Sequence, residues 1–188
     1  MSSIRLNASM VVGSAVLFLL VFLANELIFS SARFEFMRGI NWIYLPAGMR
    51  LLCTLLFGGA GAIGILFASW ITCVFYFFPD DPLRSFAGGI ASAAAPYLVY
   101  LLAQRLYGLR ASLQNLNAQR LLLLALAYSV TSPLMHHAWI LLNGGSIGPG
   151  FLVMVVGDLA GTLLVIYTMK LALAVIPMPV ARNTGERQ

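Results

Sequence analysis

Charged side chains are scarce in this sequence. They make up 9% of the 188 residues, and only six residues are Asp or Glu. A typical soluble domain carries roughly 25% charged and roughly 45–50% apolar residues. This chain is 61% hydrophobic, with a mean hydropathy of +0.92. These values exclude an ordinary soluble domain and predict an integral membrane protein.

Basic runs are also missing, although the formal net charge is +5. The arginines are scattered between apolar segments, and no basic stretch is interleaved with aromatic residues. The charge therefore does not indicate a nucleic-acid partner. It is better explained by loop charges that set the orientation of a membrane protein.

Several motifs of catalysis and metal binding are absent as well. The chain has no P-loop and no His-Glu-x-x-His zinc motif. Its two cysteines, Cys53 and Cys73, have neither CxxC nor zinc-ligand spacing, and we interpret both as small hydrophobic residues. The sequence thus predicts a chain that is not an enzyme and that holds no cofactor or metal.

Long apolar runs dominate what is present. A transmembrane helix needs about 20 mostly apolar residues, and the runs predict an all-α polytopic membrane helix bundle of about six transmembrane helices. Residues 1–176 are expected to form this transmembrane domain, followed by a short cytoplasmic tail at 177–188. The expected spans are 10–29, 46 to a tight turn at 58–62, 63–78, 83–104, 121–142 and 151–170.

The connectors carry ordinary helix signals. Pro46 suits a first helical turn, where its missing N–H is harmless. Asp80 or Asp81 is expected to cap the helix that follows the third span.

The distribution of basic residues predicts the orientation. Six spans place both termini on one side, and that side then holds seven basic residues against three or four on the other. By the positive-inside rule both termini are cytoplasmic, in the inner membrane of a bacterium. The seven are Arg5, Arg105, Arg110, Arg120, Lys170, Arg182 and Arg187, and the others are Arg33, Arg38 and Arg84, with Arg50 just inside the membrane.

One acid, Asp158, lies inside the last apolar span. A central Asp costs roughly 2.5–3.5 kcal/mol to insert, so such a residue normally faces protein or water and has a partner. At a rise of about 1.5 Å per residue, Glu26, Arg50, His136 and His137 are expected at the same outer level as Asp158. We therefore predict that these five residues form an outward-facing polar cluster.

The charges within this cluster leave two interpretations open. Arginine can join two carboxylates through its rigid fork of donors, and the surplus negative charge would suit a protonated histidine or a bound cation. In the first interpretation, Arg50 and Asp158 only lock helices together. In the second, the cluster binds a ligand, and a histidine beside carboxylates would sense protons between about pH 5 and 8.

Two short stretches resemble the bacterial membrane-associated sensor (MASE) family. They are Trp42-Ile-Tyr-Leu-Pro-Ala-Gly48 and Val156-Gly-Asp-Leu-Ala-Gly161. In that family a multi-helix membrane domain precedes cytoplasmic diguanylate cyclase, phosphodiesterase or histidine kinase domains. The resemblance implies a stand-alone sensor-like module that acts through a separate partner, and it carries over Pro46, Gly48, Gly157, Asp158 and Gly161.

The resulting functional hypothesis is a membrane sensor module. It would sense or dock a ligand at the outer cluster and signal through a separate membrane or cytoplasmic protein, with the lipid bilayer as its other partner. Alternatives are a small transporter or the substrate-binding subunit of an energy-coupling transporter, and a non-catalytic membrane scaffold. All three are compatible with a homo-oligomer.

Overall fold

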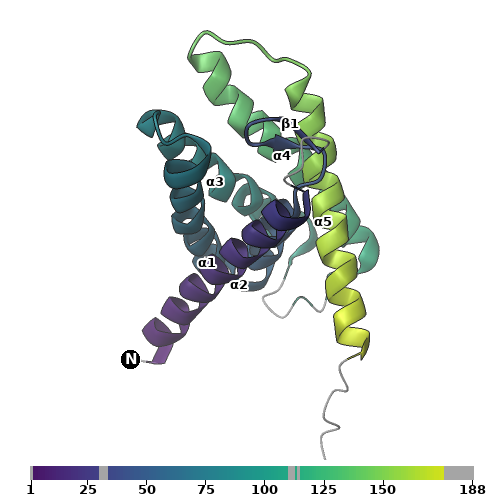
Figure 1. Ribbon diagram of the computed structural model, residues 1–188. Coiled ribbons are helices and arrows are strands. Elements are labelled where there is room, and N and C mark those ends of the chain that lie inside the picture. The colour runs from purple at the N-terminus through teal and green to yellow at the C-terminus, as the bar shows by residue number, and fades with distance from the viewer. Residues whose placement is uncertain (1, 30–33, 110–112, 114, 176–188) are drawn as a thin grey trace, which may run out of the picture.

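The computed structural model describes residues 2–29, 34–109, 113 and 115–175, and the predicted tail at 177–188 lies outside them. The described part is almost entirely helical (Figure 1). Five of its helices are long and apolar enough to cross a membrane, as expected of a multi-pass membrane protein. In chain order the elements are α1 (Ser2–Phe29), β1 (Glu35–Met37), β2 (Ile40–Asn41), α2 (Leu45–Thr72), η1 (Cys73–Phe77), α3 (Pro82–Tyr107), α4 (Ala118–Leu142) and α5 (Gly150–Val175).

The α2 helix folds back on itself at Gly58. This residue has φ 56° and ψ −130°, a conformation that favours glycine. A Cβ placed on Gly61 would clash with the carbonyl of Cys53, although residues eight apart in a straight helix are separated by about 12 Å. The helical stretch Leu45–Phe77 therefore has two arms, residues 45–57 and residues 59–77, that pack against each other.

The ends of these arms confirm the reversal. Thirty-three straight helical residues would span about 50 Å. Tyr44, just before the first arm, and Phe77, at the end of the second, nevertheless line one cavity. The expected count of six helices is not confirmed, because the described residues form five helices of membrane length, with the two arms of α2 in one of them. The predicted turn at 58–62 is nevertheless where the chain reverses.

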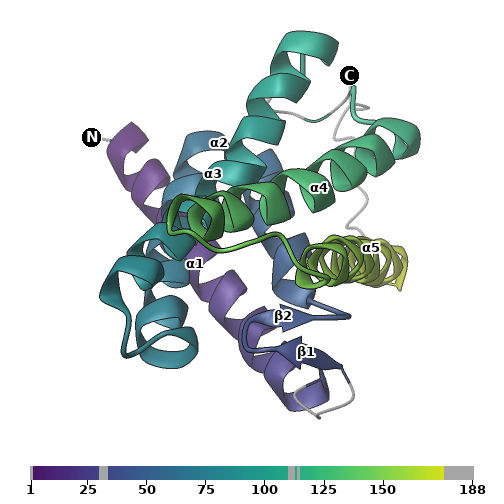
Figure 2. The same cartoon turned by 90° about the horizontal axis from the view of Figure 1, so that it is seen from above.

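Contacts make α2 the centre of the bundle. It packs against α1, α3 and α5, while α4 joins α3 to α5 (Figure 2). The antiparallel β1–β2 hairpin, which the sequence did not predict, lies beside the start of α5 in both views. Many large apolar side chains face outward, which suits a lipid environment.

The helix boundaries follow their sequence signals. Asp81 accepts a hydrogen bond of 3.0 Å from the backbone N–H of Arg84, so it is the cap of α3. Asn117 caps α4 in the same way. Pro46 lies in the first turn of α2, as predicted. The start of α2 is also held by Asn25 of α1, whose side-chain oxygen accepts from the N–H of Leu45 at 2.9 Å.

Candidate functional site: a cationic cavity

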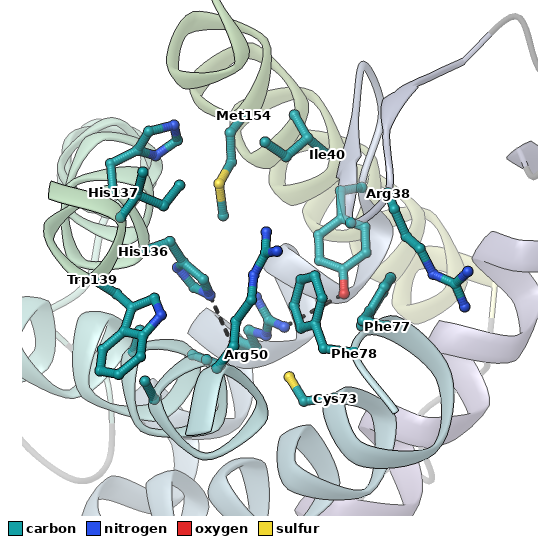
Figure 3. Close-up of a pocket in the computed structure, with 18 residues that line it drawn as sticks. Arg38, Ile40, Arg50, Cys73, Phe77, Phe78, His136, His137, Trp139 and Met154 are labelled. Carbon is teal, nitrogen blue, oxygen red and sulfur yellow. Dashed lines mark hydrogen bonds between the residues drawn. The ribbon is translucent and has the colours of Figure 1, made fainter. Parts of the chain in front are cut away.

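A cavity of about 80 Å³ lies where the hairpin, both ends of the α2–η1 unit and the ends of three other elements meet. This volume is enough for several water molecules or one small ligand. In Figure 3, residues of α4 such as His136 and Trp139 line one side, and Arg38, Phe77 and Phe78 line the opposite side. Its lining includes Arg38, Tyr44, Arg50, Phe77, Phe78, Arg84, Ser92, His136, His137, Trp139 and Met154.

The cavity is cationic. Arg38, Arg50 and Arg84 line it, and its lining contains no Asp or Glu. Arg38 donates a hydrogen bond to the carbonyl of Tyr76, and the guanidinium carbon of Arg84 lies 3.9 Å from the centre of the Phe78 ring. Neither arginine forms an ion pair with a residue in the described part of the chain.

Arg50 is the buried member of this set, with an exposed fraction of 4%. Its guanidinium carbon lies 5.2 Å from the ring centre of Phe18 and 5.3 Å from that of Tyr44. Its Nη2 donates to the Tyr44 hydroxyl at 3.4 Å, whereas its Nε has no partner. Aromatic faces thus stabilise this charge in place of a carboxylate, which for a desolvated arginine is worth about 2 kcal/mol.

The two histidines differ in their surroundings. The Nδ1 of His136 and that of His137 lie 2.9 Å and 3.0 Å from the carbonyls of Ser132 and Pro133. Because a carbonyl only accepts, each Nδ1 carries the proton. The Nε2 of His136 then lies 3.4 Å from the Ser92 hydroxyl at the cavity wall. His137 packs edge-on against Phe151, with ring centres 5.3 Å apart.

Glu26 does not join this group. One of its carboxylate oxygens accepts from the Tyr76 hydroxyl and the other from the side-chain amide of Asn25. It does not line the cavity and forms no ion pair with Arg50. The expected five-residue cluster is therefore divided, because Tyr76 and Asn25 hold the acid at the end of α1.

Asp158 is buried, with an exposed fraction of 1%, and does not line the cavity either. It lies within electrostatic reach of Arg50, but the two form no ion pair. Its Oδ2 has no hydrogen-bond partner. Arg50 thus lines the cavity and is also close to the buried acid, without forming an ion pair with it.

The glycines of the two sensor-like stretches meet in a joint between residues 41–48 and α5, called the glycine joint below. The N–H of Tyr44 donates to the carbonyl of Gly157 at 3.1 Å. A Cβ on Gly161 would clash with the backbone of Tyr44, and one on Gly157 with that of Asn41. A Cβ on Gly48 would come within 2.9 Å of the Thr162 Cα. Only residues without side chains allow this backbone approach.

Sequence reasoning missed two cavity arginines, Arg38 and Arg84, which it counted only as topology signals. Both are exposed, and they become cavity residues only because the hairpin and the start of α3 come together. Tyr44 was also missed as a partner of Arg50. Its spacing of six residues from Arg50 gives no helical signal, since Tyr44 precedes the helix.

Two short catalytic patterns occur by letter but lack their structural context. Gly144-Gly-Ser-Ile-Gly148 matches Gly-x-Ser-x-Gly, but it lies on an exposed connection between two helices, whereas a nucleophile elbow joins a strand to a helix. Gly59, Gly61 and Gly64 match Gly-x-Gly-x-x-Gly within α2, whereas a dinucleotide site follows a strand.

Comparisons with known proteins do not extend the assignment. No family model matches the chain, and no curated protein or solved structure is significantly similar to it. No group of three or more His, Cys, Asp or Glu residues suited to a metal ion occurs in the described ranges. A function can therefore be inferred only from the chemistry of the cavity itself.

Proposed function

We propose that this chain is a multi-pass membrane sensor module whose cavity binds a small oxyanion. The observation that supports this best is a cavity lined by three arginines and two histidines with no carboxylate among its lining residues. Arginine presents a planar fork of donors that fits carboxylate, phosphate and sulfate groups. An anion is the missing counter-charge.

The wall composition supports a compact ligand of this class. Phe77, Phe78 and Trp139 provide apolar walls on the cavity, and electrostatic attraction is stronger in surroundings of low polarity. The free space of about 80 Å³ suits an ion of the size of sulfate or phosphate better than a large metabolite.

The proposed orientation places the cavity on the outer face of a bacterial inner membrane. The cavity lies at the end of the bundle that receives the hairpin and the start of α3, whereas Arg105, Arg120 and Lys170 lie near the ends or start of helices away from it. Because the helical stretch Leu45–Phe77 begins and ends at the cavity, α1 and α5 run from the cavity end to the opposite, cytoplasmic end. The positive-inside rule supports that assignment.

The route to a separate partner protein would run through the glycine joint. Tyr44 lines the cavity with its side chain and contacts α5 with its backbone. A shift of the residue on ligand binding would move α5, whose far end points to the proposed cytoplasmic side. The resemblance to membrane-associated sensors favours this output, because those domains act on cytoplasmic signalling domains.

The proposal is tested by comparing anion binding to the wild type and to the Arg84→Gln variant. Isothermal titration of the purified protein with sulfate and with phosphate, in low-chloride buffer, should show saturable binding. Arg84→Gln should weaken it about tenfold or more, because a hydrogen bond to a charged group contributes about 1.5–3 kcal/mol. Arg105→Gln is the matched control, since Arg105 lies on the same helix but does not line the cavity. Equal affinity in all three proteins would refute the proposal.

Two further measurements separate related functions. Titration in nanodiscs of zwitterionic and of anionic lipid distinguishes a soluble oxyanion from a lipid headgroup, because an anionic headgroup would compete with sulfate. Uptake of labelled sulfate into proteoliposomes would favour a transporter. Binding without uptake, together with copurification of a signalling protein, favours a sensor.

A further inference from the structure

A second group of polar side chains lies behind the cavity, between α2, α4 and α5. Its members are buried, and each has a polar atom without a hydrogen-bond partner. Buried polar atoms are nearly always paired, so several orphans together indicate a site that gains protons, water or an ion. The atoms are Arg50 Nε, Tyr128 Oη, Ser132 Oγ, Asp158 Oδ2 and Thr162 Oγ1. We call this group the acid chamber.

The members of the acid chamber are neighbours. Tyr128 and Ser132 are one turn apart on α4, and Asp158 and Thr162 are one turn apart on α5. Asp158 lies close to the Ser132 hydroxyl and within electrostatic reach of Arg50, and Tyr128 lies within electrostatic reach of Asp158 and Arg50. Arg50 is the one member that also lines the cavity.

The other titratable groups around Asp158 are few. Arg50 belongs to α2, and Tyr44 precedes that helix. Tyr128 and the two histidines belong to α4. Both histidines line the cavity, and His137 also packs against Phe151, two turns before Asp158. The hairpin, which also touches α5, carries Glu35 and Arg38, and both are exposed.

We propose that Asp158 takes up a proton when an anion binds in the cavity, with Arg50 as the group that couples the two sites. This inference rests on the proposed function. In the empty protein the positive charge of Arg50 stabilises the buried Asp158 carboxylate. A bound oxyanion neutralises Arg50 and leaves Asp158 as an isolated charge inside a membrane, which is costly.

The step balances in protons, and the proton taken up offsets one negative charge of the entering anion. One anion enters the cavity, and the Asp158 carboxylate takes one proton from water to become a neutral carboxylic acid. Its new O–H can donate to the oxygen of Tyr128 or Ser132, which now have no partner. Because the anion-bound state holds more protons, rising pH disfavours binding, by up to about tenfold in affinity per pH unit.

A proton fits this chamber better than Na⁺. A metal ion would lie beside the guanidinium of Arg50, which repels it, and would require several oxygen ligands at once. A proton on Asp158 removes the negative charge without adding a positive one. Sodium dependence of anion binding is therefore the result that distinguishes the two.

The experiment measures sulfate binding and proton uptake together. Sulfate keeps its charge between pH 5 and 8, so any proton change belongs to the protein. Titrations in buffers of different ionisation enthalpy should show uptake of up to one proton per sulfate, and affinity should fall as pH rises. Sulfate-induced difference infrared spectra of the wild type should gain a band of a protonated carboxylic acid.

Variants assign the proton to its residue. Asp158→Asn should bind sulfate with little pH dependence and should lack the infrared band. Asp80→Asn, a matched change at an exposed loop acid, should behave like the wild type. His136→Gln should keep both the band and the pH dependence, even if its affinity falls. If Asp158→Asn does not fold, the infrared band of the wild type still decides.

The outcomes separate the two proposals. If neither sulfate nor phosphate binds the wild type, both the proposed function and this inference are overturned. Three kinds of result overturn the inference but not the proposed function. They are sulfate binding without proton uptake, a pH dependence of affinity that is retained in Asp158→Asn or lost in His136→Gln, and a requirement for Na⁺. Proton uptake that disappears only in Asp158→Asn supports it.

Discussion

The cationic cavity and the glycine joint are adjacent regions built in opposite ways. Tyr44 belongs to both, with its side chain in the cavity and its backbone in the joint. The cavity consists of long charged and aromatic side chains around free space. The joint has no free space, because α5 touches the backbone of residues 41–48 directly. We infer that the joint determines where Tyr44 and Arg50 lie, while the cavity residues can be changed without loss of the fold.

The largest expected effect breaks the joint. In Gly161→Val the new Cβ meets the backbone of Tyr44 and Leu45, which cannot rotate away as a side chain would. We expect the free energy of unfolding to fall by about 3 kcal/mol or more, the range of severe overpacking. Thermal unfolding in detergent measures it.

The control for this variant is a glycine with open space. Gly148 is exposed, and a Cβ there would meet nothing within 4 Å. Gly148→Val should change the unfolding temperature little, as surface substitutions do. Equal destabilisation by both variants would mean that the joint has no special role.

A smaller loss of stability is expected when the contact between α1 and the start of α2 is removed. Asn25 accepts a hydrogen bond from the N–H of Leu45, and it is 1% exposed. Asn25→Ala leaves that donor unpaired, which costs about 1–3 kcal/mol. Thermal unfolding compared with Asn143→Ala, an exposed asparagine at the end of α4, checks this. A loss no larger than the control's would contradict the assignment of Asn25 as the anchor of α2.

The smallest expected effect concerns Glu26. Because Glu26 does not line the cavity, Glu26→Gln should change sulfate affinity by less than about twofold. Solvent and salt screen the remaining electrostatic interaction between Glu26 and the bound anion. Stability should fall by about 1 kcal/mol or less, since Gln can still accept from Tyr76. A large change in sulfate affinity, measured by titration, would return Glu26 to the binding site.

Much of the fold was predictable because the signals are local. Apolar runs of membrane length, the cap at Asp81 and the proline at the start of α2 each depend on neighbouring residues alone. The reversal at Gly58 was predicted from a glycine-rich stretch for the same reason. The β1–β2 hairpin was missed, because a three-residue and a two-residue strand carry too little pattern to read.

The candidate site was predictable only in part. An acid, an arginine and two histidines in apolar helices are conspicuous, and a common depth follows from helical rise. Which of them meet does not follow from depth. Glu26 and Arg50 have similar expected depths, yet Glu26 contacts Tyr76, whereas Arg50 contacts Phe18 and Tyr44. Rotation about each helix axis decides this, and packing sets that rotation.

The sequence by itself determined that this protein is a helical, multi-pass membrane protein, because composition and run length act through the solvent that each residue prefers. Only the tertiary structure decided that the charge of the candidate site is positive. Arg38 of the hairpin and Arg84 of the first turn of α3 joined Arg50 around the cavity, and Glu26 and Asp158 were both left outside it. The physical reason is that charge in a cavity is a sum over neighbours in space, and those neighbours come from elements far apart in the chain.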